Sequence, residues 1–175
     1  MKIAFTGPES TGKSTISTAV AEYFQAEWFR EYARPYLMER NGEYQFENIE
    51  DIAVKQEHER SLSSENGIGI YDTENSVLYI WSIFKYGKCS PVVEELMNHQ
   101  QFDHYFLCSP DGIPWEDDPL REHPNQREEL FEIYLETLKR LNVEYTILMG
   151  TEQNRTEKAI ELIEELTLSK GGFCF

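Results

Sequence analysis

Apolar residues along the chain follow two alternating patterns, which predict strands and helices in turn. Short apolar runs of strand type precede longer segments whose apolar residues recur every three or four positions. The predicted strands are 2–6, 26–30, 67–72, 102–108 and 145–150. The predicted helices are 14–24, 47–64, 74–86, 91–101, a segment running through 130–141, and 154–168. This alternation favours a single α/β domain over residues 1–175, with a parallel five-stranded sheet and helices on both faces.

A glycine-rich segment joins the first predicted strand to the first predicted helix. Residues 7–14 read GPESTGKS and match the phosphate-binding loop pattern G-x-x-x-x-G-K-[ST] at every fixed position. Backbone N–H groups of such a loop turn toward phosphate oxygens, and the helix N-terminus adds its dipole. A simple strand-to-helix turn is the alternative, but the flanking strand and helix favour a nucleoside triphosphate site.

Each position of this loop has an expected task. Lys13 is expected to reach the β- and γ-phosphates of ATP, and the Ser14 hydroxyl is expected to bind Mg²⁺. The predicted phosphate-binding residues of the loop are Gly7, Glu9, Ser10, Thr11, Gly12, Lys13 and Ser14.

Composition limits the class of partner. The formal net charge of −16 argues against nucleic acid or an anionic membrane, since both would be repelled. We also expect no signal peptide before Met1 and no membrane span, because no apolar run is long enough. The three cysteines are scattered and without metal-ligand spacing, which is typical of reduced thiols in a cytoplasmic protein. The four histidines show no partner pattern and are expected to be structural or exposed.

A carboxylate ends the third predicted strand. The apolar run 67–72 closes at Asp72, and parallel strands place their carboxyl ends on the ligand-binding side of a sheet. Beside a phosphate loop, such a carboxylate can organise Mg²⁺ or accept the proton of an attacking hydroxyl. Asp is also a common turn residue. The phosphate loop favours a functional role, and the sequence leaves base and metal ligand open.

The segment 111–127 is rich in Pro, Gly and charge, which is typical of a loop. Arg121 and Arg127 bracket the start of the helix that follows. Two arginines on a mobile segment would suit a lid that clamps phosphate. The alternative is that both are helix-surface residues paired with nearby glutamates such as Glu122. We expect the lid, because the phosphate loop needs additional positive charge.

Two further segments carry candidates for substrate contact. Trp81 and Tyr86 follow closely after Asp72, so a ring from the helix 74–86 could face the substrate, although core packing is the ordinary role of such a stripe. The turn 150–155 follows the last strand and could lie against adenine, which makes Arg155 an ATP-binding candidate.

Five pieces of sequence, in order, resemble the nicotinamide riboside (ribosylnicotinamide) kinase domain of the NadR family. They are FTGPESTGKST, EYARPY, YDT, IWSIF with KYG, and PWEDDPLR. The resemblance spans residues 2 to about 166. It implies a fold like those of nucleoside and nucleoside-monophosphate kinases. It also implies transfer of the ATP γ-phosphate to the ribose 5′-hydroxyl of nicotinamide riboside, which gives nicotinamide mononucleotide in NAD salvage.

The resemblance also implies roles for individual residues. Phosphates and Mg²⁺ would be bound by Lys13, Ser14 and Thr15, with Asp72 near the 5′-hydroxyl. The nucleoside site would be lined by Glu31, Arg34, Trp81, Trp115 and Asp118, and the lid arginines would be Arg121 and Arg127. The chain contains no H-x-G-H motif for adenylyl transfer, so the resemblance implies one activity. Two residues depart from the family pattern: Pro35 stands where a helix-compatible residue is expected, and Gly112 alters the spacing before Pro114 and Trp115.

The sequence therefore predicts an ATP- and Mg²⁺-dependent kinase acting on nicotinamide riboside, with small molecules as its partners. A kinase for another nucleoside, deoxynucleoside or nucleoside monophosphate is the nearest alternative, because the fold and phosphate site are shared. A regulatory ATP-binding module is the alternative without catalysis. The sequence gives no indication of the oligomeric state.

Overall fold

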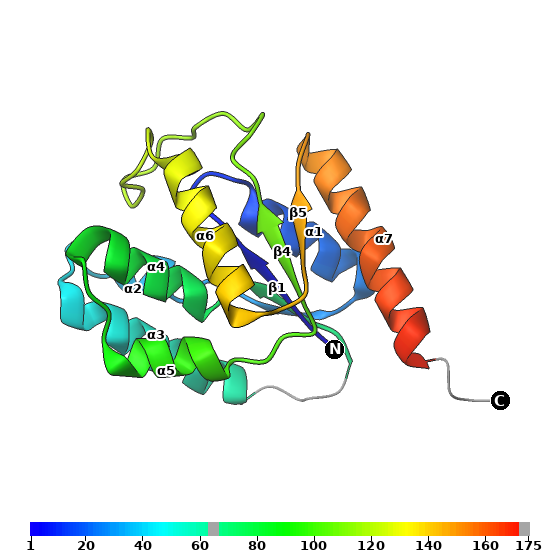
Figure 1. The fold of residues 1–175 in the computed structure, drawn as a ribbon, viewed down its shortest axis with the longest axis horizontal. Helices are drawn as coiled ribbons and strands as arrows, with labels where there is room; N and C mark the ends of the chain where they lie inside the picture. The colour runs from blue at the N-terminus through cyan, green and yellow to red at the C-terminus, as the bar shows by residue number, and fades with distance from the viewer. Residues whose placement is uncertain (63–66, 172–175) are drawn as a thin grey trace.

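Parallel pairing joins the strands of the computed structural model, which describes residues 1–62 and 67–171. Within these residues one five-stranded sheet has the spatial order β2-β3-β1-β4-β5, with every neighbouring pair parallel. The strands are β1 (Lys2–Thr6), β2 (Glu27–Phe29), β3 (Gly69–Asp72), β4 (His104–Cys108) and β5 (Tyr145–Leu148). The expected α/β fold is confirmed, and all carboxyl ends of the strands meet at one edge (Figure 1).

Helices cover both faces of the sheet (Figure 1). They are α1 (Lys13–Phe24), α2 (Ala33–Met38), α3 (Phe46–Ser61), α4 (Asn75–Tyr86), α5 (Pro91–His99), α6 (Arg127–Leu141) and α7 (Glu152–Gly171). On one face α1 and α7 pack together against alternate strand residues such as Phe5 and Phe106. On the other face α4 and α6 pack against the intervening residues, among them Ala4 and Tyr105. The strands are buried on both faces, as expected for a parallel sheet.

A separate apolar cluster lies beside the sheet. It joins α2 and α3 to α4 and α5 through residues such as Leu37, Ile52, Leu78 and Val93. The helix α4 belongs to both clusters, because Ile80 faces the sheet and Leu78 faces α3. This helix therefore fixes the position of the lateral helices relative to the strand ends.

The helix α2 is the one described element that the hydrophobic pattern did not predict. Pro35 is its third residue, where the missing N–H removes no intrahelical hydrogen bond. The departure noted at Pro35 is therefore compatible with a short helix. The helix α7 starts at Glu152, two residues earlier than predicted, because the Thr151 hydroxyl accepts a hydrogen bond from the Asn154 backbone N–H at 3.2 Å. Residues 63 and 64, predicted to end the third helix, lie outside the described residues.

Two expectations from composition can be compared with the structure. In the described part of the chain, no helix is long and apolar enough to cross a membrane. Cys89 and Cys108 are free thiols, and Cys108 is buried at the end of β4. Cys174 lies outside the described residues.

Arg155 connects the ends of several elements from a fully buried position in α7. Its guanidinium donates hydrogen bonds to the carbonyl oxygens of Gly150 (2.8 Å), Ser109 (2.7 Å), Asp111 (2.9 Å) and Thr11 (3.2 Å). Burial lowers the pKa of Arg155, but a guanidinium stays charged at physiological pH. These bonds join the phosphate loop, the end of β4 and the start of α7.

Replacing this guanidinium should destabilise the fold. Arg155→Met keeps the length of the side chain but leaves buried carbonyls without donors, and we expect a loss of about 2–4 kcal/mol in the free energy of unfolding. Urea denaturation followed by circular dichroism measures it. Lys158→Met, on an exposed position of the same helix, is the control and should change stability by less than about 0.5 kcal/mol. Equal losses of stability in both variants would contradict this structural role of the Arg155 guanidinium.

Candidate active site

The phosphate loop runs from the end of β1 into α1 and requires glycine at two positions. Gly7 has φ 128°, and a Cβ there would lie 2.7 Å from the carbonyl oxygen of Cys108, closer than any side chain tolerates. Gly12 has φ 79° and immediately precedes α1. The fixed glycines of the motif thus allow a left-handed turn and a close approach to β4.

Lys13 lies against the loop that precedes it. Its ammonium donates hydrogen bonds to the carbonyl oxygens of Gly7 (2.8 Å) and Pro8 (2.6 Å). The Thr11 hydroxyl donates to the same Pro8 carbonyl at 2.9 Å, which closes the loop internally. The structure therefore places a positive charge against the loop whose backbone N–H groups are expected to bind phosphate.

Asp72 ends β3 beside the loop, where it pairs in register with Phe5 of β1. The side chain is nearly inaccessible, at 3% exposure, and its Oδ1 has no hydrogen-bond partner within residues 1–62 and 67–171. Burial raises the pKa of Asp72, and the neighbouring Ser14 hydroxyl, followed by Lys13, opposes that rise. A carboxylate oxygen without a partner next to a hydroxyl suits a cation bound beside the phosphates.

A buried carboxylate supports the turn that follows Asp72. Thr73 has φ 83°, an unfavourable value for a β-branched residue, so neighbouring contacts must hold it. The Glu74 carboxylate accepts hydrogen bonds from the Thr6 hydroxyl (2.8 Å), the Ser76 backbone N–H (2.7 Å) and the Gln100 side chain. Because Thr6 directly precedes Gly7, this contact fixes Asp72 relative to the phosphate loop.

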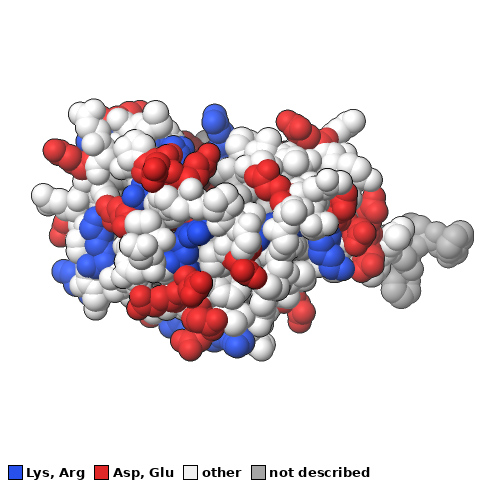
Figure 2. Space-filling view, turned by 90° about the horizontal axis from the view of Figure 1, so that it is seen from above, with Lys and Arg blue, Asp and Glu red and all other residues white. Residues whose placement is uncertain are grey.

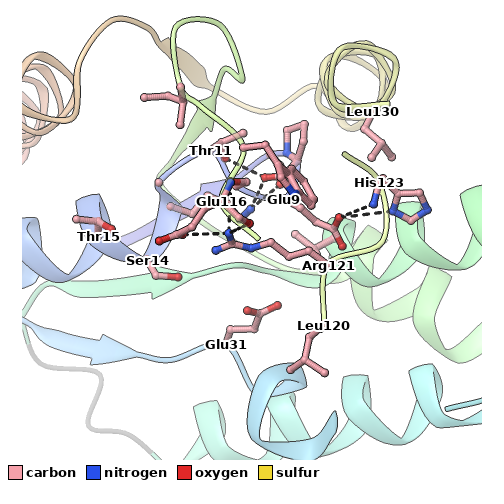
Figure 3. A pocket seen from close by; sticks show the side chains of 18 of the residues that line it. Glu9, Thr11, Ser14, Thr15, Glu31, Glu116, Leu120, Arg121, His123 and Leu130 are labelled. Atoms are coloured by element: carbon pink, nitrogen blue, oxygen red, sulfur yellow. Dashed lines mark hydrogen bonds and ion pairs between the residues drawn. The ribbon is translucent and has the colours of Figure 1, made fainter. Parts of the chain in front are cut away.

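A cavity of about 1000 Å³ opens along the loop (Figure 3). It is lined by thirteen of the residues that the sequence proposed for the site, together with others. The thirteen are Gly7, Glu9, Ser10, Thr11, Gly12, Lys13, Ser14, Thr15, Glu31, Arg34, Trp81, Trp115 and Arg121. The turn expected near adenine also lines it, through Thr151, Glu152 and Gln153. These residues make up the phosphate-loop side of the wall and part of its opposite side.

Glu31 is one of the carboxylates that line the cavity (Figure 3). It follows β2 and points inward from the floor of the site in this view. Burial raises the pKa of Glu31, and the nearby Asp72 raises it further, while Lys13 and Arg34 oppose the rise. Arg34 forms an ion pair with Asp118 at 2.6 Å, and the cation lowers the pKa of Asp118 against the effect of burial. Arg34 and Asp118, both predicted for the nucleoside site, are therefore joined by an ion pair.

The far end of the cavity is aromatic. Tyr44, from the connection between α2 and α3, packs edge-on against Trp81 with ring centroids 4.7 Å apart. Its hydroxyl accepts hydrogen bonds from Trp81 Nε1 (2.8 Å) and Lys85 Nζ (2.6 Å), and donates to Glu122 at 2.8 Å. Burial and the bond to Glu122 raise the pKa of Tyr44, which keeps the hydroxyl protonated. Tyr44 lies in a polar connection without a motif, so no sequence signal distinguished it.

The two predicted lid arginines lie over the phosphate loop. Arg121 donates to the Glu116 carbonyl (2.6 Å) and carboxylate (3.0 Å), and Arg127 donates to the carbonyls of Ser10 and Ile113, both at 2.9 Å. Neither hydrogen-bonds Glu122 as the surface alternative supposed. Arg127 also stacks 5.9 Å from the centre of the Trp115 ring.

Some predicted residues do not reach the cavity wall. Tyr86 packs edge-on against Phe46 at 5.5 Å instead, because five positions along a helix turn it by about 140° from Trp81. Asp72, Asp118 and Arg127 do not line the cavity, but each contacts a residue that does: Ser14, Arg34 and Ser10, respectively. Arg155 is also behind the wall, and its donors are engaged by backbone carbonyls, so the structure gives it a role in supporting the loop.

Charge on the face above the strand ends is mixed. Figure 2, which looks down from the top of Figure 1, shows basic and acidic side chains interspersed on this face. The net charge of −16 is therefore not the local charge of the site, where Lys13, Arg34 and Arg121 line the cavity with several carboxylates. In the described part of the chain, no group of three or more His, Cys, Asp or Glu residues is placed so that it could bind a metal ion.

Comparison with known families agrees with this arrangement. Residues 2–155 match the family described as AAA domain, AAA_28. The chain belongs to this family. The matched range extends from β1 to Arg155 and so includes the phosphate loop, Asp72 and the residue that anchors the loop.

Relatives and solved structures point to the same group of proteins. The "Trifunctional NAD biosynthesis/regulator protein NadR" of Salmonella typhimurium is 25% identical over 178 residues, which cover 97% of this chain and 43% of that protein. The chain thus spans less than half the length of this relative. A crystal structure of NadR in complex with NR has a TM-score of 0.77 at 20% identity, covering 94% of this chain and 50% of the other.

A second solved structure shows how widely the fold is shared. Deoxyadenosine kinase from M. mycoides has a TM-score of 0.64 at 16% identity, covering 94% of this chain and 100% of the other. The resemblance to NadR and the P-loop kinase fold are confirmed by these comparisons.

The geometry of the loop makes Lys13 the first residue to test. Lys13→Ala should lower the turnover of ATP by at least about a hundredfold, because the ammonium stabilises charge that develops between the β- and γ-phosphates. ADP release measures the turnover, and thermal unfolding should show an intact fold. Lys139→Ala, on the exposed face of α6, is the control. A folded Lys13→Ala variant with normal turnover would remove the assignment of the phosphate loop.

Proposed function

We propose that the chain is an ATP-dependent nicotinamide riboside kinase, which transfers the γ-phosphate to the ribose 5′-hydroxyl and gives nicotinamide mononucleotide. The observation that carries the proposal is one continuous cavity with a phosphate loop at one end and an aromatic, carboxylate-rich wall at the other. Its volume of about 1000 Å³ lies at the upper end of the range for ligand pockets, which suits two substrates side by side. The solved structure of a NadR protein in complex with NR supports this acceptor.

At the donor end, the loop residues 7–15 would surround the phosphates, with Lys13 at the β- and γ-positions. Arg121 and Arg127 lie above the loop, where a positive charge can stabilise the phosphoryl group in transfer. The segment 111–127 would then act as the lid, and it excludes water from the reaction. Adenine would lie toward Thr151 and Gln153.

The residues for Mg²⁺ in this proposal are Ser14 and Asp72. The fit rests on the Asp72 Oδ1, which is buried without a partner in the described structure, and on the adjacent Ser14 hydroxyl. Few protein ligands are needed, because Mg²⁺ at such sites keeps waters and takes phosphate oxygens. When bound, Mg²⁺ supplies neutralising charge to the β- and γ-phosphates.

The sequence left Asp72 between two roles, and the geometry favours separate roles for two carboxylates. Glu31 lines the cavity, whereas Asp72 lies behind it beside Ser14. We therefore assign proton acceptance to Glu31 and metal organisation to Asp72. The 5′-oxygen attacks the γ-phosphorus, its proton passes to Glu31, and the bond to ADP breaks. The raised pKa of Glu31 makes it a stronger base for this step.

The acceptor end suits a cationic ring. Nicotinamide in the riboside is a pyridinium, and the face of Trp81 can attract it by about 0.5–2 kcal/mol. Tyr44 takes the place that the sequence gave to Tyr86, because it packs on Trp81 and lines the cavity. The carboxylates of Glu31 and Glu122 also line the cavity and would add attraction.

The free thiols of Cys89 and Cys108 suit a cytoplasmic location for this reaction.

A kinase for another nucleoside is the second candidate. The observation that favours it is the similarity to deoxyadenosine kinase over nearly the whole of both chains, with a TM-score of 0.64. That similarity shows the fold, which many kinases share. A purely regulatory ATP-binding module is less suited to the site, since such a module needs neither a cavity-facing base nor arginines above the phosphates.

Substitution of the two carboxylates separates their roles. Glu31→Gln should lower kcat by about a hundredfold or more, and the small remaining rate should lose its acid limb in the pH profile. The reason is that wild-type turnover rises with pH as Glu31 loses its proton, around a pKa above the usual range of glutamate. Asp72→Asn should instead raise the Mg²⁺ concentration needed for half-maximal rate. An unchanged pH profile in Glu31→Gln would assign the base to another residue.

The choice of acceptor tests the proposed function itself. We expect ADP release with nicotinamide riboside to exceed that with uridine, thymidine or nucleoside monophosphates by about tenfold or more in kcat/KM. Trp81→Ala should raise KM for nicotinamide riboside and leave KM for ATP nearly unchanged. Trp28→Phe, outside the cavity, is the matched control. Similar kcat/KM values for the nucleosides would reassign the chain to the general nucleoside kinases.

A further inference from the structure

Glu9 occupies a variable position of the phosphate loop, and its carboxylate contacts the lid. The Oε2 oxygen accepts hydrogen bonds from the backbone N–H groups of Glu122 (3.0 Å) and His123 (3.1 Å). The His123 ring nitrogen Nδ1 lies 3.7 Å from the same oxygen (Figure 3). The sequence predicted that Glu9 binds phosphate. A carboxylate is a poor phosphate ligand because the two charges repel, whereas two adjacent amides are good donors to it.

The two residues that Glu9 holds also contact the acceptor end of the cavity. The Glu122 carboxylate forms an ion pair with Lys85 at 2.8 Å and accepts the Tyr44 hydroxyl at 2.8 Å. The His123 ring packs edge-on against Phe84 of α4, with centroids 5.0 Å apart. A continuous chain of contacts therefore leads from the phosphate loop through two lid residues to the aromatic wall.

Ser10, the next residue of the loop, holds the rest of the segment. Its hydroxyl accepts the Glu116 backbone N–H at 2.9 Å and lies 3.4 Å from the Arg121 guanidinium. Its carbonyl accepts Arg127 at 2.9 Å. Residues 9 and 10 thus fix both arginines above the loop, and Glu9 fixes the part of the lid nearest the acceptor.

We propose that Glu9 is a positioning residue that couples the two substrate sites through the backbone amides of Glu122 and His123. The coupling, which rests on the proposed function, follows from the shared lid segment. Ordering this segment costs conformational entropy, and the first substrate to bind bears that cost for the second. Each substrate should therefore bind more tightly when the other is present. Without Glu9 the ends of the cavity lose their link, while the phosphate-binding groups remain.

Hydrogen exchange tests the contact without any ligand. In Glu9→Ala the amides of Glu122 and His123, resolved by NMR, should exchange about tenfold faster than in the wild-type protein. Glu9→Gln keeps an acceptor oxygen but no charge and should give a smaller increase. Glu22→Ala, an exposed position on α1, is the control for loss of one carboxylate. Wild-type exchange at both amides in Glu9→Ala would overturn the proposal. If Glu9→Ala does not fold, Glu9→Gln is measured in its place.

Substrate binding tests the coupling. In the wild-type protein the Kd for nicotinamide riboside should fall about fivefold or more when a non-hydrolysable ATP analogue is present. In Glu9→Ala this difference should fall below about twofold. Coupling that persists in Glu9→Ala would overturn the proposal. If nicotinamide riboside does not bind the wild-type protein, the proposed function fails, and the exchange experiment alone decides the role of Glu9.

Discussion

The structure depends on a single buried cation that holds strand ends, loop and helix together. The guanidinium of Arg155 donates hydrogen bonds to carbonyl oxygens of the phosphate loop, of the segment after β4 and of the turn before α7. Carbonyls at the ends of strands have no partner within the sheet, and burying them without donors is costly. One planar group with five donors satisfies several of them at once. The loop is therefore rigid on the side away from the cavity and can present its amides to the other side.

The cavity concentrates opposite charges in a protein that is acidic overall. Carboxylates from the loop, the end of β2 and the lid lie near Lys13 and Arg121, and each is held by a named partner or faces the cavity. Burial makes the pKa values of some of these carboxylates differ from those of exposed ones. Burial raises the pKa values of both Glu31 and Asp72, Asp72 raises that of Glu31 further, and Lys13 and Arg34 oppose both rises. Such pairs are typical of sites where one group moves a proton and another holds a cation.

The lid differs from the loop in how it is held. Residues 111–126 form no helix or strand, and they contact the body through side chains of Glu9, Ser10 and Arg127. Because these contacts belong to an irregular segment and not to a ladder of strands, opening the lid costs less free energy than separating the strands. The same contacts reach the lateral helices through Lys85 and Tyr44. The lid thus touches both ends of the cavity.

The sequence by itself determined the alternation of strands and helices and the phosphate loop, because both depend on local patterns. The spacing of apolar residues predicts each helix or strand, and the glycines and the lysine of the loop lie within a few residues of one another. It also proposed Glu31, Trp81 and Arg121 for the site, through short pieces of sequence that resemble the NadR family, and all three line the cavity. Only the tertiary structure decided that Tyr44 and not Tyr86 lies beside Trp81, and that Glu9 binds the lid. These contacts join residues far apart in the chain, where packing and charge, not local pattern, choose the partner.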